Sequence, residues 1–82
     1  MTPDNARAIV LKALHEVAPE ADTEELEPDA DFREQLDIDS MDFLNFIIGV
    51  HETTRIDVPE ADYDQLETLH ACVDYIVKHA LQ

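Results

Sequence analysis

The sequence predicts a small all-α fold, a four-helix bundle made of three longer helices and one short helix. Three observations lead to this prediction. Apolar residues recur at helical spacing in three stretches, residues that start helices precede each stretch, and 82 residues suffice for one domain with a small core. We therefore expect a single domain over residues 1–82, with a long loop between the first and second helices.

The first helix is expected over about residues 4–17. Thr2 can cap it, Pro3 suits the first helical position, and Asp4 favours the positive end of the helix dipole. Its apolar stripe consists of Ile9, Val10, Ala13, Leu14 and Val17. Pro19 ends the helix, and a loop over about 18–39 follows. We expect this loop to fold back onto the core through its irregularly spaced apolar residues, which are Leu26, Phe32, Leu36 and Ile38.

The second helix is expected over about residues 40–53, after a polar stretch that ends at Asp39 and Ser40. Either side chain can accept hydrogen bonds from the first free N–H groups of the helix. Its apolar residues occupy more than one stripe, so the helix lies centrally or presents an apolar surface to a ligand or partner. These residues are Met41, Phe43, Leu44, Phe46, Ile47, Ile48 and Val50.

An extended link over residues 56–59 should follow the second helix, because the residue before Pro59 avoids helical conformations. A short third helix is expected over residues 60–66. Thr68 can cap the fourth helix, expected over about residues 69–80. The apolar stripe of this last helix consists of Leu69, Cys72, Val73, Ile76, Val77 and Ala80.

The chain is strongly acidic, with 5 Lys and Arg against 20 Asp and Glu and a formal net charge of −15. Such a surface repels nucleic acids and anionic membranes, and it attracts basic patches on other proteins. A disordered acidic chain is the alternative, but an apolar content of 45% argues against it. We therefore expect a folded domain that has protein partners and no nucleic acid partner.

Cys72 is the only cysteine, so no disulfide can form within the chain, which suits a reducing cytosol. No basic N-terminal segment precedes an apolar run, as a signal peptide would require. The longest apolar run, around residues 46–50, is far too short to span a bilayer. We expect a monomeric, cytoplasmic protein without a membrane span, in which Cys72 is buried and inert.

The sequence resembles the acyl carrier protein family over nearly the whole chain. The residues that carry the resemblance are Phe32, Leu36, the triplet Asp39-Ser40-Met41 and the segments 56–59 and 68–76. The resemblance implies a covalent cofactor, 4′-phosphopantetheine from coenzyme A, joined to Ser40 by a phosphodiester. The terminal thiol of that group would carry acyl groups as thioesters. A serine at a helix start suits a phosphate, because the positive end of the helix dipole favours negative charge.

The resemblance further implies a non-catalytic carrier that is handled by other enzymes. Its partners would be a phosphopantetheinyl transferase and acyl-activating, condensing or acyl-transfer enzymes with basic docking patches. The residues expected at the partner surface are Asp39, Met41, Asp42, Glu52 and Glu60. A pocket for the acyl chain could be lined by Phe43, Phe46 and Ile47, for which plain core packing is the alternative.

The sequence departs from the family in the second helix, which is usually the acidic recognition face. Asn45 and His51 stand where carboxylates are common. Thr54 occupies a position that is often a core phenylalanine, and Asp37 replaces a glycine that is frequent three residues before the serine. These differences favour a specialised carrier, for polyketide or lipid-like biosynthesis, over a housekeeping carrier of fatty acid synthesis.

Other interpretations of the same residues stay open. Ser40 taken alone is an ordinary helix cap, and the chain could be an unmodified acidic interaction module. A peptidyl or D-alanyl carrier would share the serine chemistry and load aminoacyl groups. An EF-hand that starts at Asp29 fails, because its sixth and twelfth positions are Glu34 and Ser40. The four histidines share no metal-ligand spacing and Ser40 has no evident base, so neither a metal site nor a catalytic triad is expected.

Overall fold

The computed structural model describes residues 1–80, so Leu81 and Gln82 of the predicted domain lie outside the described residues. All its elements are helices, with η denoting a 3₁₀ helix. In chain order they are α1 (Pro3–Val17), η1 (Thr23–Glu25), α2 (Phe32–Gln35), α3 (Ser40–Thr54), η2 (Glu60–Leu66) and α4 (Leu69–Ala80). The predicted all-α class is confirmed, and the four predicted helices agree with α1, α3, η2 and α4 to within one residue at each end.

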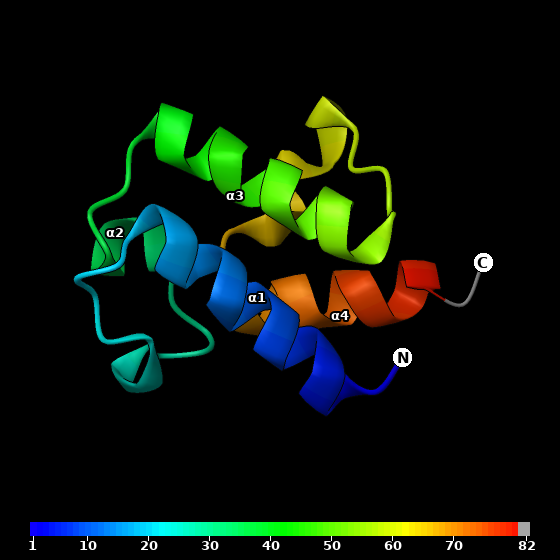
Figure 1. Ribbon diagram of the computed structural model, residues 1–82, viewed down its shortest axis with the longest axis horizontal. Helices are drawn as coiled ribbons and strands as arrows, with labels where there is room; N and C mark the ends of the chain where they lie inside the picture. Colours follow the sequence, from blue (N-terminus) through cyan, green and yellow to red (C-terminus); the bar gives the residue numbers. More distant parts are fainter. Residues whose placement is uncertain (81–82) are drawn as a thin grey trace.

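The long helices form one bundle in which α1 packs against both α3 and α4, and α4 packs against η2 (Figure 1). The start of α3 lies at the same end of the molecule as α2. The start of α1 and the end of α4 lie together at the opposite end (Figure 1). The fold therefore separates the start of α3 from the start of α1 and the end of α4 by nearly the full length of α3.

Each long helix begins at a capping side chain. The Thr2 hydroxyl oxygen accepts a hydrogen bond from the Asn5 N–H (3.2 Å), and Pro3 occupies the first turn, as predicted. The Thr68 hydroxyl oxygen likewise accepts from the Ala71 N–H at 3.0 Å, which confirms the predicted cap of α4. At the other end of α3, Arg55 adopts a left-handed conformation with φ of 63°, and its N–H donates to the His51 carbonyl.

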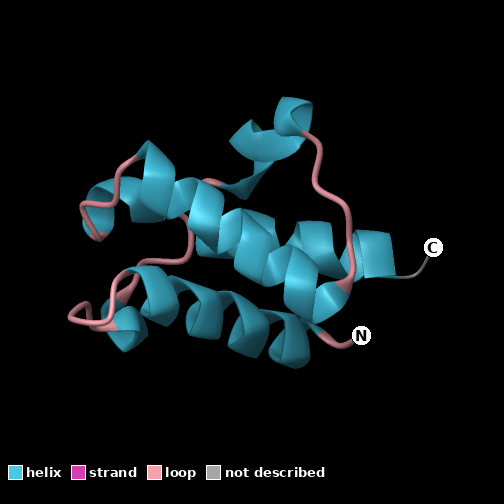
Figure 2. Cartoon of the chain, turned by 45° about the horizontal axis from the view of Figure 1, so that its top comes forward, coloured by secondary structure: helices cyan, strands magenta, loops and turns pink. Residues whose placement is uncertain are grey.

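The prediction of an irregular loop over residues 18–39 was wrong in part, because the segment contains η1 and α2 (Figure 2). Both helices are short and start at an aspartate cap. The Asp22 carboxylate accepts from the Glu24 N–H, and that of Asp31 accepts from the Arg33 N–H at 2.7 Å. A single turn offers no repeating apolar stripe, so the periodicity could not indicate it. The expected attachment to the core is confirmed, because Leu26, Phe32 and Ile38 are buried and Leu36 is half-buried.

Hydrogen bonds fasten this connecting segment to the start of α4. The Phe32 N–H donates to the Glu67 carbonyl and the His70 N–H donates to the Pro28 carbonyl, both at 2.9 Å. Asp31 and Thr68 form an antiparallel bridge between these two bonds. The His70 ring adds an ionisable contact, since its Nδ1 lies 3.0 Å from an Asp29 carboxylate oxygen. The segment before α3 is therefore held in place by α4, although the two are far apart in sequence.

We expect the contribution of His70 to stability to depend on pH. A hydrogen bond to Asp29 and the charge of Asp74, with Nε2 3.7 Å from its carboxylate, raise the pKa of His70 above 6.5. A raised native pKa stabilises the folded state below the unfolded pKa, and this stabilisation disappears as pH rises through the native pKa. The native protein should therefore melt at a higher temperature than His70→Gln near pH 6, and the difference should vanish near pH 9, at roughly two units above the ordinary pKa.

Thermal melts at the two pH values, with an NMR titration of the His70 ring, measure this effect. His15→Gln is the matched control, because His15 is exposed on α1 and has no ion pair among residues 1–80. Its melting temperature at each pH reports the effect of losing an imidazole that takes part in no ion pair among residues 1–80. A difference between the native protein and His70→Gln that does not change between pH 6 and pH 9 would refute the role of His70.

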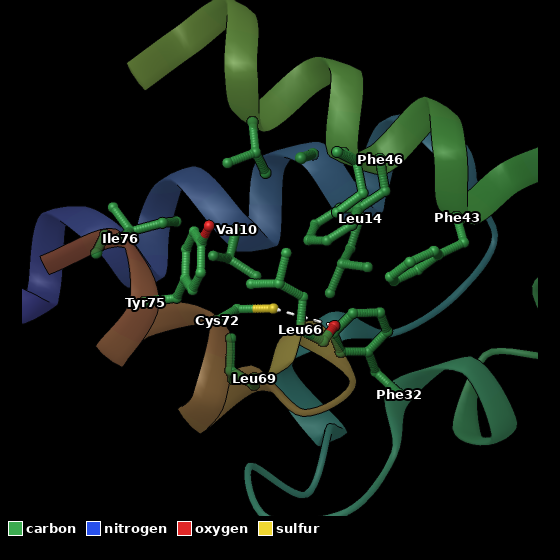
Figure 3. Packing of buried hydrophobic residues seen from close by; sticks show 14 of the residues in the cluster. Val10, Leu14, Phe32, Phe43, Phe46, Leu66, Leu69, Cys72, Tyr75 and Ile76 are labelled. Carbon is green, nitrogen blue, oxygen red and sulfur yellow. Dashed lines mark hydrogen bonds between the residues drawn. The ribbon is translucent and has the colours of Figure 1, made fainter. Parts of the chain in front are cut away.

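The core contains three phenylalanines that contact one another beneath α3 (Figure 3). Ring centroids are 5.3 Å apart for Phe32 and Phe46, 6.3 Å for Phe32 and Phe43, and 6.0 Å for Phe43 and Phe46. All three side chains are at most 5% exposed. Such rings contribute packing beyond their buried area, so this cluster fixes α2 and α3 relative to each other.

A partly buried hydrogen bond joins α4 to η2. The Tyr75 hydroxyl donates a hydrogen bond to the Asp62 carboxylate at 2.8 Å, and burial together with this bond raises the pKa of Tyr75 to about 12. Cys72, one turn before Tyr75, is 1% exposed, and burial raises the pKa of its thiol. The expected burial of Cys72 is confirmed, and its inertness stays a prediction that the raised pKa supports, because a protonated thiol is a poor nucleophile.

Asp37 stands where carrier sequences often have a glycine, and its φ of 53° gives the physical reason. This left-handed residue turns the chain between α2 and α3, and the next residue, Ile38, is buried. We expect Asp37→Gly to stabilise the protein by at most about 0.5–1 kcal/mol, because glycine adopts this conformation without steric cost but loses more backbone entropy on folding.

Chemical denaturation of the native protein and Asp37→Gly measures this difference. Asp37→Asn serves as the control that removes the negative charge and keeps a side chain. A glycine variant that is less stable than the asparagine variant would contradict the assignment of strain to this turn.

Candidate functional site

The Ser40 hydroxyl lies exposed at the first turn of α3 and is not the helix cap. The cap is Asp39, whose backbone is extended and whose carboxylate accepts a hydrogen bond from the Asp42 N–H at 2.9 Å. Of the two residues that the sequence left as possible caps, the structure selects Asp39. No hydrogen bond within residues 1–80 occupies the Ser40 side chain. Ser40 is also the only serine of the chain, so no second serine competes for its chemistry.

Ser40 borders a surface hollow of about 420 Å³ between α3 and η2, which we call the Ser40 hollow. Its lining mixes aromatic, acidic and basic side chains: Arg33, Ser40, Phe43, Leu44, Glu60, Tyr63, Asp64 and Glu67. Tyr63 also lines a neighbouring hollow of about 470 Å³, together with Ile47, Ile48, His51, Asp57, Val58 and Pro59. The two hollows therefore follow the α3–η2 interface away from Ser40.

The three residues predicted to line an acyl pocket occupy different places. Phe43 lines the Ser40 hollow, where Tyr63 meets its ring edge-on at a centroid distance of 5.8 Å. Ile47 lines the neighbouring hollow. Phe46 lines neither hollow and lies in the core at 1% exposure. Phe46 is therefore a core residue only. Phe43 and Ile47 have one side in the core and one side at a hollow.

The residues predicted at the partner surface are exposed, apart from Asp42, which is half-buried in the first turn of α3. Met41 is 67% exposed, and Glu60 also lines the Ser40 hollow. Leu44 and Ile48 were expected only as part of a second apolar stripe, with Ile48 also a possible lining of an acyl cavity; they are 40% and 44% exposed and share one side of α3 with Met41, and Ile48 lines the neighbouring hollow. The helical periodicity of the sequence indicates their exposure, because they fall between the buried positions of the same helix.

Three of the acidic residues before Ser40 make contacts that hold the fold together. Asp29 pairs with His70, Asp31 caps α2 and Asp39 caps α3. Among residues 1–80, no three or more His, Cys, Asp or Glu side chains are grouped so that they could hold a metal ion. His51 lies at the other end of α3, where its Nδ1 is 3.0 Å from the Ile56 carbonyl oxygen and 3.4 Å from the Asp57 carboxylate.

Another hollow, of about 1030 Å³, lies where α1 begins and α3 and α4 end. Thr54 borders it, with its hydroxyl bonded to the Val50 carbonyl at 2.7 Å. None of the predicted site residues lines this hollow. A phenylalanine, common at the Thr54 position in carrier sequences, would bring a larger apolar side chain to this place.

None of the helices within residues 1–80 is both long and apolar enough to cross a bilayer. Chemically, the site offers an exposed hydroxyl at a helix start, next to a partly aromatic hollow that contains one guanidinium group. A hydroxyl in that place can accept a phosphoryl-linked group, and the helix start favours the negative charge of the phosphate. The residues present therefore suit a phosphate-linked arm.

Comparison with known proteins agrees with this chemistry. A protein-family model described as "Phosphopantetheine attachment site" matches residues 7–76. The chain is 30% identical over 76 residues to an acyl carrier protein of Rubrobacter xylanophilus, covering 89% of this chain and 94% of that protein. It is 31% identical over 58 residues to an acyl carrier protein of Lactobacillus johnsonii, covering 71% and 72% of the two chains. In fold, the acyl carrier protein from Enterococcus faecalis is similar with a TM-score of 0.79, at 22% identity over 96% of this chain and 99% of that chain.

Proposed function

We propose the following role for a chain that belongs to the acyl carrier protein family: Ser40 is the residue to which its 4′-phosphopantetheine is attached. Proteins of this family are non-catalytic carriers with that covalent cofactor, and they interact with a phosphopantetheinyl transferase and with acyl-handling enzymes. When bound, the cofactor supplies a thiol on which acyl groups travel as thioesters. The observation that supports Ser40 is its exposed hydroxyl at the start of α3, unused for capping because Asp39 is the cap.

The neighbouring residues have supporting tasks at this site. Asp39 fixes the first turn of α3, so Ser40 is presented on a rigid helix and not on a mobile loop. No base within this chain is needed, because the transferase supplies the chemistry of attachment. Exposed carboxylates at Asp39, Glu52 and Glu60 suit basic side chains on the partner enzymes.

We also propose a specialised carrier, for polyketide or lipid-like biosynthesis, over a housekeeping carrier of fatty acid synthesis. On α3 the exposed side chains Met41, Leu44 and Ile48 are apolar, and acidic residues are sparse between Asp42 and Glu52. A partner that docks on this face must match an apolar strip with few charges. The single, buried Cys72 further suits a monomeric carrier in the reducing cytosol, with residues 1–82 as one carrier domain.

Intact mass spectrometry tests the proposal. The native protein is incubated with coenzyme A and each of several phosphopantetheinyl transferases, and a mass increment of one phosphopantetheine is expected. The modified protein is then offered fatty acids, short polyketide-type acyl groups and amino acids with their activating enzymes. Loading with amino acids alone would indicate a peptidyl or D-alanyl carrier. No increment with any transferase would indicate an unmodified acidic interaction module and refute the proposal.

A further inference from the structure

Arg33 has an unusual place for a cation in so acidic a chain. It is the only Lys or Arg between Lys12 and Arg55, and it lines the Ser40 hollow together with Ser40 itself. Its side chain is half-buried, and its guanidinium carbon lies 4.8 Å from the centroid of the Phe43 ring. A guanidinium stacked on an aromatic face keeps its orientation while its N–H donors stay available at the edge.

Those donors are not used by the carboxylates nearby. Glu60, Asp64 and Glu67 line the same hollow, yet within residues 1–80 every ion pair involves a histidine and none involves Arg33. An arginine has five N–H donors, and one without an acidic partner can use them to bind an oxyanion such as a phosphate. The geometry of the hollow thus leaves a cation available next to the hydroxyl of Ser40.

The three carboxylates would repel a phosphate in this hollow, and a cation among them offsets that repulsion. A phosphodiester on Ser40 adds a negative charge to a hollow whose other charged lining residues are acidic, apart from Arg33. Like charges that line one hollow destabilise one another. Arginine pairs well with phosphate oxygens, because its planar fork can donate two parallel hydrogen bonds.

We infer that Arg33 is a positioning residue that pairs with the phosphodiester of the arm on Ser40 and holds the near part of the arm in the Ser40 hollow. The inference rests on the proposed attachment at Ser40. Phe43 and Tyr63 provide the apolar wall against which the near part of the arm lies, and Arg33 neutralises its charge. The carrier would then orient its own arm before a partner enzyme binds.

The test compares the native protein with Arg33→Gln and Arg33→Lys, each in the unmodified form and in the form modified from coenzyme A. Arg7→Gln is the matched control, since it removes the same charge from an exposed position on α1. Intact mass first establishes the extent of modification in every variant. The ³¹P chemical shift of the phosphodiester and nuclear Overhauser contacts from the arm to the Phe43 and Tyr63 rings then report the position of the arm.

In the native protein and in Arg7→Gln, contacts from the arm to both rings are expected, with a ³¹P shift that moves on addition of salt. Arg33→Gln should lose the contacts and the salt dependence, and Arg33→Lys should keep them in part because it retains the charge. The melting temperature of the modified protein, taken relative to the unmodified form, should be about 2–4 °C lower for Arg33→Gln than for the native protein. This is the size expected for one partly exposed charge pair in a small domain.

Two outcomes would overturn the inference and leave the attachment at Ser40 intact. In the first, Arg33→Gln is fully modified and keeps the ring contacts and the ³¹P shift of the native protein. In the second, ring contacts appear only after loading of a carboxylate-bearing acyl group such as malonyl, and not with the free thiol or an acetyl group. The second result would assign Arg33 to the cargo and not to the phosphodiester. Absence of any mass increment in the native protein would refute the attachment and the inference together.

Discussion

Ser40→Ala is expected to abolish modification by coenzyme A completely, while the fold stays intact. The variant lacks the only serine hydroxyl of the chain, and no threonine lies at the start of α3. Stability should change by less than about 0.5 kcal/mol, because Ser40 is exposed and Asp39, not Ser40, caps the helix. Intact mass after incubation with a transferase measures the first effect, and thermal melting followed by circular dichroism measures the second.

Thr53→Ala is the matched control for a hydroxyl on the same helix. Thr53 is exposed near the end of α3, and its hydroxyl donates to the Gly49 carbonyl at 3.0 Å. This variant should be modified to the same extent as the native protein. A mass increment that persists in Ser40→Ala would place the attachment elsewhere. A Ser40→Ala variant that unfolds would show that the hydroxyl has a structural task that the described hydrogen bonds do not include.

Phe46→Ala is expected to destabilise the protein by about 3–5 kcal/mol, the cost of removing a fully buried aromatic ring from a close-packed core. Phe46 is 1% exposed and meets Phe32 edge-on at 5.3 Å. Small domains have a total stability of about 5–15 kcal/mol, so a large part of the stability is lost. Urea denaturation at 25 °C, followed by circular dichroism, measures the loss.

Ile48→Ala provides the comparison on the exposed side of α3, where truncation should change stability by no more than about 0.5 kcal/mol. Comparison of Phe46→Ala with Ile48→Ala distinguishes a role of Phe46 in the core from a role in holding an acyl chain. If Phe46 served mainly an acyl chain, the unmodified Phe46→Ala protein would be nearly as stable as the native protein. A loss below about 1 kcal/mol would therefore contradict the assignment of Phe46 to the core.

The long helices could be predicted from the sequence because their signals are local. A capping residue and a repeating apolar stripe are both contained within the helix itself, as at Thr2 for α1 and Thr68 for α4. At α3 the local signal was ambiguous between Asp39 and Ser40. The backbone resolves it, because Asp39 is extended with ψ of −176°, whereas Ser40 is the first helical residue.

The surroundings of Ser40 could not be predicted in the same way, because tertiary contacts create them. Arg33 and Tyr63 reach the Ser40 hollow from α2 and η2, two elements far apart in sequence that border the same hollow only after the bundle forms. Likewise, His70 and Asp29 are 41 residues apart and gave no pairing signal. The free side of α3 was the exception, since the same periodicity that marks Phe43, Phe46, Ile47 and Val50 as buried leaves Met41, Leu44 and Ile48 outside.

The burial of Cys72 has a practical consequence for studying this carrier. Because the only cysteine is 1% exposed and burial raises the pKa of its thiol, we expect a thiol-specific chromophore added to the folded protein to react with the free thiol of the cofactor arm and not with Cys72. The absorbance then counts modified molecules directly, without any substitution in the chain. Adding denaturant afterwards exposes Cys72 once per molecule, so a single cuvette yields both the occupancy of the arm and the protein concentration that normalises it.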